Sequence, residues 1–311
     1  MDYPKEVIVL EVGPRDGLRM ETKMLSVEQK VELIERVADA GVKYIEIGSL
    51  VHPKAVPQMA DTDEVAKRIT RKSGVEYSVL VMNLKGVERA LDAGIEKIKF
   101  SVSASRAHSL KNQNREPEEV VRSLAESVEF AAKHNIRVGT GISMSFGCPF
   151  EGDMPISALE KLIEEFIRLG ISEIAPADTV GLGNPGQVYS WMKHFKEKYP
   201  QVHWGVHLHN TRGLALANTY AALLAGVTEF GSCFAGIGGC PFAPGASGNV
   251  ATEDVIYLFN SMGIASGCDL QKYIAIAGTV QEWLGHDSDT YQLHVARAHA
   301  GLRECRTAAS S

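Results

Sequence analysis

The feature that most constrains this chain is a regular alternation of short apolar segments with longer amphipathic ones. Eight segments rich in β-branched and aromatic residues have the length of buried strands, at 7–12, 44–49, 77–82, 97–102, 137–144, 173–177, 203–209 and 229–235. Each is followed by a segment of helical periodicity, at 26–40, 62–72, 85–93, 118–134, 157–169, 187–198, 214–225 and 252–262. Strands that alternate with helices predict a parallel sheet, because parallel neighbours require a crossover connection.

Four of these predicted helices end in the same way before the next strand begins. The glycines at these junctions are Gly41, Gly94, Gly170 and Gly226, and each of them precedes Val or Ile. Glycine adopts the left-handed conformation at low cost, which ends a helix and returns the chain to the sheet. The recurring junction indicates an internal repeat of βα units.

A chain of 311 residues can hold two domains or one large barrel. No linker rich in Pro or Ser separates the eight units, so we predict an α/β fold, a closed (β/α)8 TIM barrel with extra C-terminal helices, rather than an open doubly wound sheet. Residues 1–265 form the predicted catalytic barrel. Residues 266–311 form a helical extension, with helices at 269–284 and 291–302, which we expect to pack on the barrel or on a partner subunit.

Charge and cysteine content exclude several functional classes. The net charge is −6 at pH 7, so neither a nucleic acid nor an anionic membrane surface is an expected partner. The cysteines are odd in number and lack a CxxC pair, which argues against a disulfide framework and a structural zinc site; they are Cys148, Cys233, Cys240, Cys268 and Cys305. The N-terminus enters an apolar run at once, and no apolar run approaches the ~18 residues of a membrane span, so we expect a cytoplasmic protein.

Polar residues are concentrated near the ends of the predicted strands, where the active site of a parallel barrel lies. His207 and His209 are spaced i, i+2 on a strand, so both side chains project from the same side. This spacing suits two metal ligands, although two histidines bonded to backbone carbonyls are the alternative. Asp16 is the natural third ligand, because the first strand closes the barrel beside the eighth. Asn249 offers an amide oxygen as a fourth ligand, or caps the helix predicted at 252.

This mixed nitrogen and oxygen donor set suits Mg²⁺ or Mn²⁺, with Zn²⁺ as an alternative, acting as a Lewis acid on substrate oxygens. Arg15 could supply a fixed cation to a developing enolate oxygen, or form a structural salt bridge to Glu46. Glu46 could equally orient Arg15 or Asp16. Asp178, after the sixth strand, could cap the following helix or hydrogen-bond a histidine ligand.

A glycine-rich loop follows the eighth strand. Residues 236–249 contain five glycines and two prolines, a composition that favours a mobile lid over a purely structural loop. Cys240 lies within this loop and could act as an acid or base if a nearby cation lowers its pKa.

Three motifs resemble those of the hydroxymethylglutaryl-CoA lyases. They are EVGPRDGL at 11–18, HLHN at 207–210 and GIGGCPFAPGASGNVATED at 236–254, and weaker similarity covers residues 5–275. The resemblance implies cleavage of 3-hydroxy-3-methylglutaryl-CoA to acetyl-CoA and acetoacetate, a step of leucine degradation, by a metal-dependent homodimer.

The same resemblance implies roles for individual residues. The implied metal ligands are Asp16, His207, His209 and Asn249. Arg15 would stabilise the acetyl-CoA enolate, and Cys240 would be the acid and base of the loop. Arg15, Asp16, Glu46, His207 and Cys240 together form the predicted catalytic set, and Arg15, Arg19, Glu46, Asn83 and Asp178 the predicted substrate contacts.

The chain departs from the family pattern around the acyl pocket. It reads HLHN where HCHD is usual, RDGLRME for RDGLQNE, and IEIGSLVHPK for IETTSFVSPK, and the segment SASRAHSLKNQN lacks the usual Ser-Glu pair. Arg19, Arg106 or His108 could contact a longer or more acidic acyl group, or could be solvated loop charges. The alternatives are therefore a lyase for a different 3-hydroxy-3-carboxyalkyl-CoA, a condensing synthase of the same barrel group, and a catalytically silent barrel.

Overall fold

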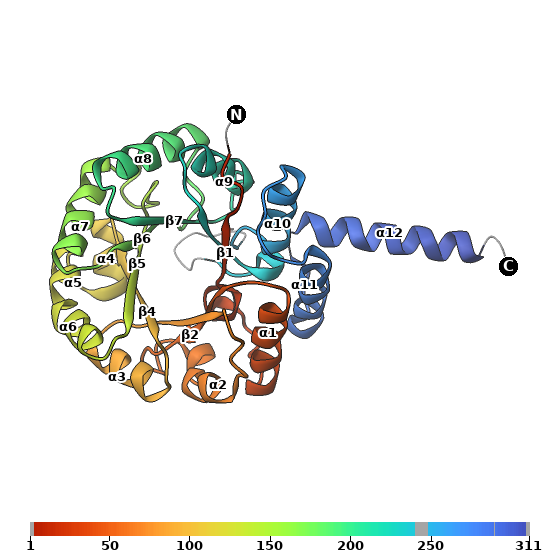
Figure 1. Cartoon of the computed structure of the whole chain (residues 1–311), viewed down its shortest axis with the longest axis horizontal. Coiled ribbons are helices and arrows are strands. Elements are labelled where there is room, and N and C mark those ends of the chain that lie inside the picture. Colours follow the sequence, from red (N-terminus) through yellow and green to blue (C-terminus); the bar gives the residue numbers. More distant parts are fainter. Residues whose placement is uncertain (1–2, 240–247, 289, 309–311) are drawn as a thin grey trace.

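Eight parallel strands form a closed barrel in chain order in the computed structural model, which describes residues 3–239, 248–288 and 290–308 (Figure 1). The strands are β1 (Ile8–Glu11), β2 (Tyr44–Ser49), β3 (Glu76–Leu80), β4 (Lys97–Ser103), β5 (Arg137–Ser143), β6 (Glu173–Asp178), β7 (His203–Leu208) and β8 (Glu229–Ser232). Closure comes from β1, whose Leu10 pairs with Tyr44 of β2 on one side and with Gly231 of β8 on the other. The predicted barrel and its eight strands are confirmed.

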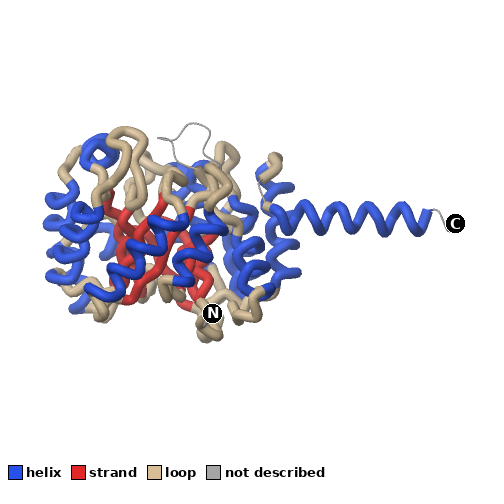
Figure 2. The backbone as a smooth tube through the Cα atoms, turned by 90° about the horizontal axis from the view of Figure 1, so that it is seen from above, coloured by secondary structure: helices blue, strands red, loops and turns tan. Residues whose placement is uncertain are grey.

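A ring of helices covers the outside of the barrel (Figures 1 and 2). They are α1 (Val27–Asp39), α2 (Thr62–Arg68), α3 (Leu84–Asp92), α4 (Arg106–Gln113), α5 (Pro117–Ser123), α6 (Ala125–Lys133), α7 (Ile156–Arg168), α8 (Pro185–Lys198), α9 (Ala215–Leu224) and α10 (Thr252–Ser261). The four junction glycines all have positive φ, at 97° for Gly41, 67° for Gly94, 82° for Gly170 and 84° for Gly226. The predicted left-handed helix ends are therefore confirmed.

Two helical regions differ from the prediction. The segment expected as one helix at 118–134 is divided at Leu124 into α5 and α6. Helix α4 occupies the polar segment that was expected to be a loop, and it begins where Ser105 Oγ accepts a hydrogen bond from the His108 backbone N–H at 3.1 Å. This second difference matters for function, because α4 lies directly after β4 at the active-site end of the barrel.

Two further helices follow the barrel, α11 (Leu270–Leu284) and α12 (Tyr291–Ala308). Helix α11 is joined to the barrel layer by a hydrogen bond from Asp269 N to Ala40 O at 2.8 Å, and its Tyr273 and Val280 are fully buried. Helix α12 begins at α10, where Asp254 accepts the backbone N–H groups of Tyr291 and Gln292, and then projects away from the barrel (Figure 2). The division of the chain at residue 265 stays a prediction.

Within the described part of the chain, every helix is too short or too polar to cross a lipid bilayer.

Candidate active site

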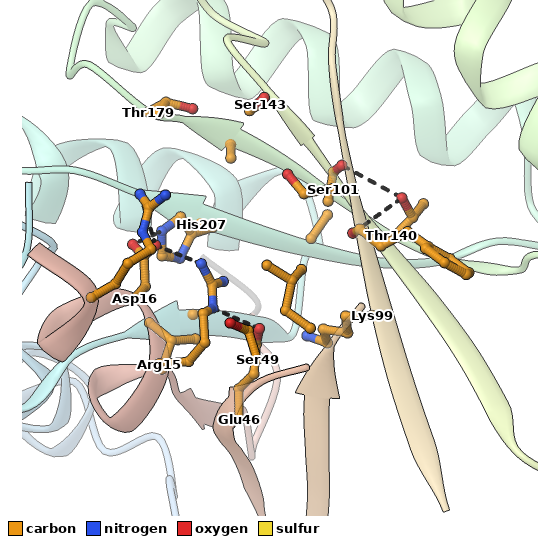
Figure 3. A pocket seen from close by; sticks show the side chains of 18 of the residues that line it. Arg15, Asp16, Glu46, Ser49, Lys99, Ser101, Thr140, Ser143, Thr179 and His207 are labelled. Atoms are coloured by element: carbon orange, nitrogen blue, oxygen red, sulfur yellow. Dashed lines mark hydrogen bonds and ion pairs between the residues drawn. The ribbon is translucent and has the colours of Figure 1, made fainter. Parts of the chain in front are cut away.

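A single π-helical turn, η1 (Gly13–Gly17), directly follows β1 and brings two consecutive charged residues to the mouth of the barrel. The backbone N–H groups of Arg15 and Asp16 both donate to Val12 O, at 3.0 and 2.7 Å. In an extended strand these two side chains would point to opposite faces. The turn instead lets both reach the same pocket (Figure 3).

Glu11, the last residue of β1, is fully buried and accepts a hydrogen bond from this turn. Its role was not identified from the sequence. Its Oε1 accepts the backbone N–H groups of Gly13 and Phe234 at 2.7 and 3.0 Å, and its Oε2 accepts the hydroxyl of Thr252 at 2.8 Å. Burial raises the pKa of Glu11 to about 7 despite these hydrogen bonds. A glutamate inside an otherwise apolar strand was the available signal. Through these hydrogen bonds, Glu11 links η1 to the loop after β8 and to the start of α10.

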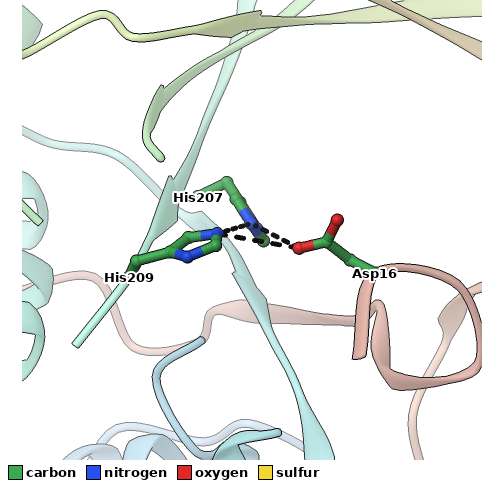
Figure 4. Close-up of side chains that lie close together, drawn as sticks. All are labelled: Asp16, His207 and His209. Atoms are coloured by element: carbon green, nitrogen blue, oxygen red, sulfur yellow. Dashed lines mark hydrogen bonds and ion pairs between the residues drawn. The ribbon is translucent and has the colours of Figure 1, made fainter. Parts of the chain in front are cut away.

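Asp16, His207 and His209 converge at the mouth (Figure 4). The Nε2 atoms of the two histidines lie 3.1 Å apart, and they lie 3.5 and 3.6 Å from Asp16 Oδ2. Strand β7 carries His207, and an antiparallel bridge between His209 and Asn249 places Asn249 beside the pair. Asp16 and His209 are buried, and His207 keeps 18% of its side-chain surface exposed.

The surroundings of these atoms fit a small divalent cation. Asn249 Nδ2 donates to Asp16 Oδ2 at 3.3 Å and to Ile237 O at 3.0 Å, while its Oδ1 is buried with no hydrogen-bond partner among the described residues. His209 Nδ1 is buried and unpartnered within the same described part. A buried polar atom usually has a partner, so Asn249 Oδ1, which lacks one and lies on a residue hydrogen-bonded to Asp16, is a candidate fourth ligand beside the three converging atoms. One carboxylate, two imidazoles and an amide form a donor set that accepts Mg²⁺, Mn²⁺ or Zn²⁺.

Arg15 is held between two carboxylates. Its Nε donates to Glu46 Oε1 at 2.7 Å and its Nη1 to Asp16 Oδ1 at 2.5 Å. Burial opposes the charge of Arg15, but Glu46 and Asp16 raise its pKa. Burial likewise opposes ionisation of Asp16, yet Arg15 and the histidines hold the pKa of Asp16 well below its usual value. Asp16 is therefore an anion at neutral pH.

The pKa of His207 is lowered, chiefly by burial, so its imidazole is neutral at physiological pH. A neutral imidazole and an ionised carboxylate are the protonation states in which these groups can bind a cation. Arg19 adds a second positive charge, with its Nη2 3.6 Å from Asp16 Oδ1.

A cavity of about 330 Å³ opens beside this cluster and extends into the barrel (Figure 3). Helix α4 contributes His108, Asn112 and Gln113 to its wall, and burial together with the charge of Arg19 lowers the pKa of His108 to about 4. The inward face of β4, which reads KIKFSVS, contributes Lys99 and Ser101. His108 was a candidate contact in the sequence, whereas Lys99 and Ser101 were missed, although polar side chains at every second position of a buried parallel strand were a visible signal.

Three other predicted site residues, Asp178, Asn83 and Arg106, lie outside the wall of this cavity. The Asp178 carboxylate accepts the backbone N–H groups of Leu182 and Gly183 at 2.8 and 3.0 Å, which braces the loop after β6. Asn83 caps α3 through a hydrogen bond from Gly86 N at 3.1 Å. Arg106 is two-thirds exposed and pairs with Glu116. Cys240, with most of the glycine-rich loop, lies outside the described residues.

Comparison with known proteins gives one consistent result. The HMGL-like family model matches residues 6–280. The hydroxymethylglutaryl-CoA lyase of Bacillus subtilis is 40% identical over 96% of this chain and 100% of its own length. A Pseudomonas aeruginosa lyase named for 3-hydroxy-3-isohexenylglutaryl-CoA and hydroxymethylglutaryl-CoA is 40% identical over 88% of this chain and 91% of its own. The structure of an Acinetobacter baumannii HMG-CoA lyase in complex with coenzyme A and 3-methylmalate has a TM-score of 0.90 at 37% identity, covering 94% of this chain and 96% of that one.

Proposed function

The chain belongs to the HMGL-like family, and on this premise we propose that it is a carbon-carbon lyase that cleaves 3-hydroxy-3-methylglutaryl-CoA to acetyl-CoA and acetoacetate. The observation that carries the proposal is the convergence of Asp16, His207 and His209 beside the guanidinium of Arg15, at the open end of a cavity. This arrangement would let the bound cation and the guanidinium of Arg15 contact the same small substrate.

Asp16, His207, His209 and Asn249 are the residues that would hold the divalent cation, for which Mg²⁺ or Mn²⁺ is the first choice and Zn²⁺ the second. When bound, such an ion supplies Lewis acidity that favours ionisation of the substrate hydroxyl. In the cleavage, the bond between C2 and C3 breaks, C3 becomes a ketone, and the electron pair passes into the thioester enolate. The enolate carbon then takes up a proton.

Arg15 is placed to stabilise that enolate. Two of its nitrogens are engaged by Glu46 and Asp16, which fixes the guanidinium plane, and Nη2 makes no hydrogen bond to any described residue. A preorganised donor aimed at developing charge contributes more in a water-poor cavity than in bulk water. Cys240 stays a prediction as the acid and base, as do the substrate contacts of Asn83 and Asp178.

The test is a coupled acetoacetate assay with 3-hydroxy-3-methylglutaryl-CoA, with and without Mg²⁺ or Mn²⁺. We expect cleavage that a chelator stops and that either metal restores. Arg15→Met should lower kcat by about 10²–10³ with little change in KM, because the lost donor acts on charge that develops in the transition state. Cys240→Ala should also lose most activity. Absence of acetoacetate with every metal would refute the proposal.

The proposal extends to the setting of the enzyme. Three described cysteines, Cys148, Cys233 and Cys268, are free thiols, and a cytoplasmic location stays a prediction. A homodimer and a place in leucine degradation stay predictions from the family resemblance.

A further inference from the structure

The cavity reaches well below the cation site. On β8, Gly231 pairs with His207, whereas Glu229, two residues earlier, pairs with Gly205 and also lines the cavity. At ~3.3 Å per residue, Glu229 lies about 7 Å deeper in the barrel than the level of His207. Lys99 also lines the cavity, four residues before Ser103 at the end of β4 (103 − 99 = 4). Figure 3 shows Lys99 among the side chains of this pocket.

Small residues create the space below the mouth. Ser101, Gly141, Ala175 and Gly231 line this part of the cavity. A Cβ atom placed on Gly141 would meet only the carbonyl oxygen of Ala175, at 3.8 Å, so Gly141 faces open space. Apolar walls complete the cavity, contributed by Leu10, Leu80 and Phe100. Such walls suit methylene groups, so the cavity offers room for a longer substituent than a methyl group.

Lys99 differs from the other deep charges in lacking a contacting partner. Lys97 forms ion pairs with Glu76, at 2.8 Å, and with Glu173, and His203 pairs with Glu229 at 2.9 Å. The ammonium group of Lys99 is near enough to contribute to the low pKa of Glu229, but it makes no hydrogen bond or ion pair with any described residue. Lys99 therefore has the charge of Glu229 nearby, but that carboxylate is hydrogen-bonded to His203. The N–H groups of Lys99 donate no hydrogen bond within the described part of the chain, so they are available to a ligand anion that enters the cavity.

We propose that Lys99 binds a carboxylate at the far end of the acyl group. The preferred substrate is then a 3-hydroxyglutaryl thioester of coenzyme A whose C3 carries a carboxyalkyl chain in place of a methyl group. The inference rests on the proposed lyase activity, and the bonds that change are the same. The bond between C2 and C3 breaks, the hydroxyl proton leaves, and the products are acetyl-CoA and a 3-oxo dicarboxylate.

The test compares three thioesters on the full-length protein with Mg²⁺. They are 3-hydroxy-3-methylglutaryl-CoA and its analogues in which the methyl group is replaced by a carboxyethyl or an isopentyl group. The last two have the same shape and differ in charge. The kcat/KM of each thioester is measured with Mg²⁺. Its Kd is measured by isothermal titration calorimetry without added metal, so that cleavage does not consume the ligand. The variants are Lys99→Met, which removes the charge, Gly141→Val, which fills the open space, and Arg106→Met, a matched loss of an exposed cation outside the cavity.

We expect the wild-type protein and Arg106→Met to favour the carboxyethyl over the isopentyl thioester by about tenfold to a hundredfold, the range for a hydrogen bond to a charged group. Lys99→Met should abolish this preference. Gly141→Val should weaken both longer thioesters relative to the methyl one. Equal use of the two isosteres by the wild-type protein, or a preference unchanged in Lys99→Met, would overturn the inference.

The same measurements distinguish failure of the proposed lyase activity from failure of the carboxylate site. If no thioester is cleaved but the carboxyethyl analogue still binds more tightly through Lys99, the lyase activity is wrong and the carboxylate site stands. If 3-hydroxy-3-methylglutaryl-CoA is cleaved but the Kd values show no effect of charge, the lyase activity stands and the carboxylate site is wrong.

Discussion

The two ends of this barrel carry similar sets of charged residues, but the side chains are arranged differently at each end. The floor cluster consists of the first residues of five strands, Glu76, Lys97, Glu173, His203 and Glu229. The mouth cluster consists of residues at or beyond the strand ends, Arg15, Asp16, Glu46, His207 and His209. Both contain carboxylates, a strong base and histidine, so residue type alone does not separate them.

Their difference lies in how the polar atoms are directed. In the floor cluster cations and anions are paired, as in Lys97 with Glu76 and Glu173 and in His203 with Glu229. The mouth cluster also contains ion pairs, of Arg15 with Glu46 and Asp16, but one carboxylate oxygen and two imidazole nitrogens converge there in addition, and Asn249 Oδ1 beside them has no partner among the described residues. Removing one member of a buried charge pair destabilises a fold, whereas converging ligand atoms need a bound cation to complete them. We therefore expect substitutions in the mouth to affect chemistry and those in the floor to affect stability.

The largest effect is expected for Asp16→Asn. The change preserves shape but removes the anion that faces both histidines and Arg15. Activity should fall by about 10³-fold or more, since loss of a single charge-stabilising group costs 10²–10³ and the cation would be lost as well. Steady-state assays and titration calorimetry with Mn²⁺ measure the two losses. The control is Glu173→Gln in the floor cluster, and activity of Asp16→Asn within tenfold of the wild type would contradict the distinction.

The second prediction concerns Lys97→Met in the floor cluster. Lys97 is 1% exposed, and its removal leaves Glu76 and Glu173 without their shared cation. The free energy of unfolding should fall by about 3 kcal/mol, the lower end of the range for a broken buried pair because both carboxylates keep some solvent contact. Urea unfolding measures the loss, and kcat should stay within about threefold.

The matched control for that variant is Lys198→Met. Lys198 forms an exposed pair with Glu160 at 2.7 Å, so its loss should cost about 0.5 kcal/mol or less. A collapse of kcat in Lys97→Met without a loss of stability would show that the floor cluster takes part in the reaction.

The sequence allowed much of the fold to be predicted, because local signals and burial agreed. The β-branched runs marked all eight strands, and Gly41, Gly94, Gly170 and Gly226 marked helix ends that require a left-handed residue. The family resemblance is also confirmed, by a family model over residues 6–280.

The parts that could not be predicted depend on contacts between distant segments. Helix α4 has Ser105 as its cap but little apolar periodicity, so it depends on contacts with the rest of the barrel, such as the hydrogen bond from Gln113 Nε2 to Ser101 O at 3.3 Å. The π-helical turn that directs Arg15 and Asp16 into one pocket depends on Glu11, Phe234 and Thr252, which are far apart in sequence. The role proposed for Lys99 depends on the cavity that it shares with Gly141, Ala175 and Gly231, which come from three other strands.

The third prediction compares two glycines at different depths in the barrel, Gly231 at the level of His207 and Gly205 at the level of Glu229. A Cβ atom on Gly231 would lie 2.9 Å from His207 Nδ1, so Gly231→Ala must displace the imidazole. On Gly205, the nearest atom would be Glu229 Oε1 at 3.3 Å, a side-chain end that can move slightly. Gly231→Ala should lower Mn²⁺ affinity by about tenfold or more, as for other disturbances of ligand orientation. Gly205→Ala should change it by less than threefold, and equal effects would contradict the assignment of His207 to the mouth cluster.

The smallest effect is the pH dependence of the His203–Glu229 pair in the floor cluster. Its hydrogen bond to Glu229 raises the pKa of His203, and although burial opposes ionisation of Glu229, His203 and the nearby lysines lower the pKa of Glu229 to about 2. The Glu229 contribution to stability is present above pH ~4.5 and is lost as the pH falls toward 2, since its folded pKa is depressed. The His203 contribution is complete below pH ~6.5 and is lost as the pH rises through its raised pKa.

The pair therefore stabilises the fold most between about pH 4.5 and 6.5. Because the His203 side chain is 48% exposed, solvent screening limits its share to about 0.5 kcal/mol. Urea unfolding of the wild type and of His203→Gln at about pH 6 and about pH 8.5 isolates this share, because other titrating groups are common to both proteins. The wild type should lose about 0.5 kcal/mol more than the variant over this interval, and less in high salt. An equal loss in the two proteins would mean that His203 is a neutral hydrogen-bond partner, and that its pair with Glu229 adds no charge-dependent stability to the floor cluster.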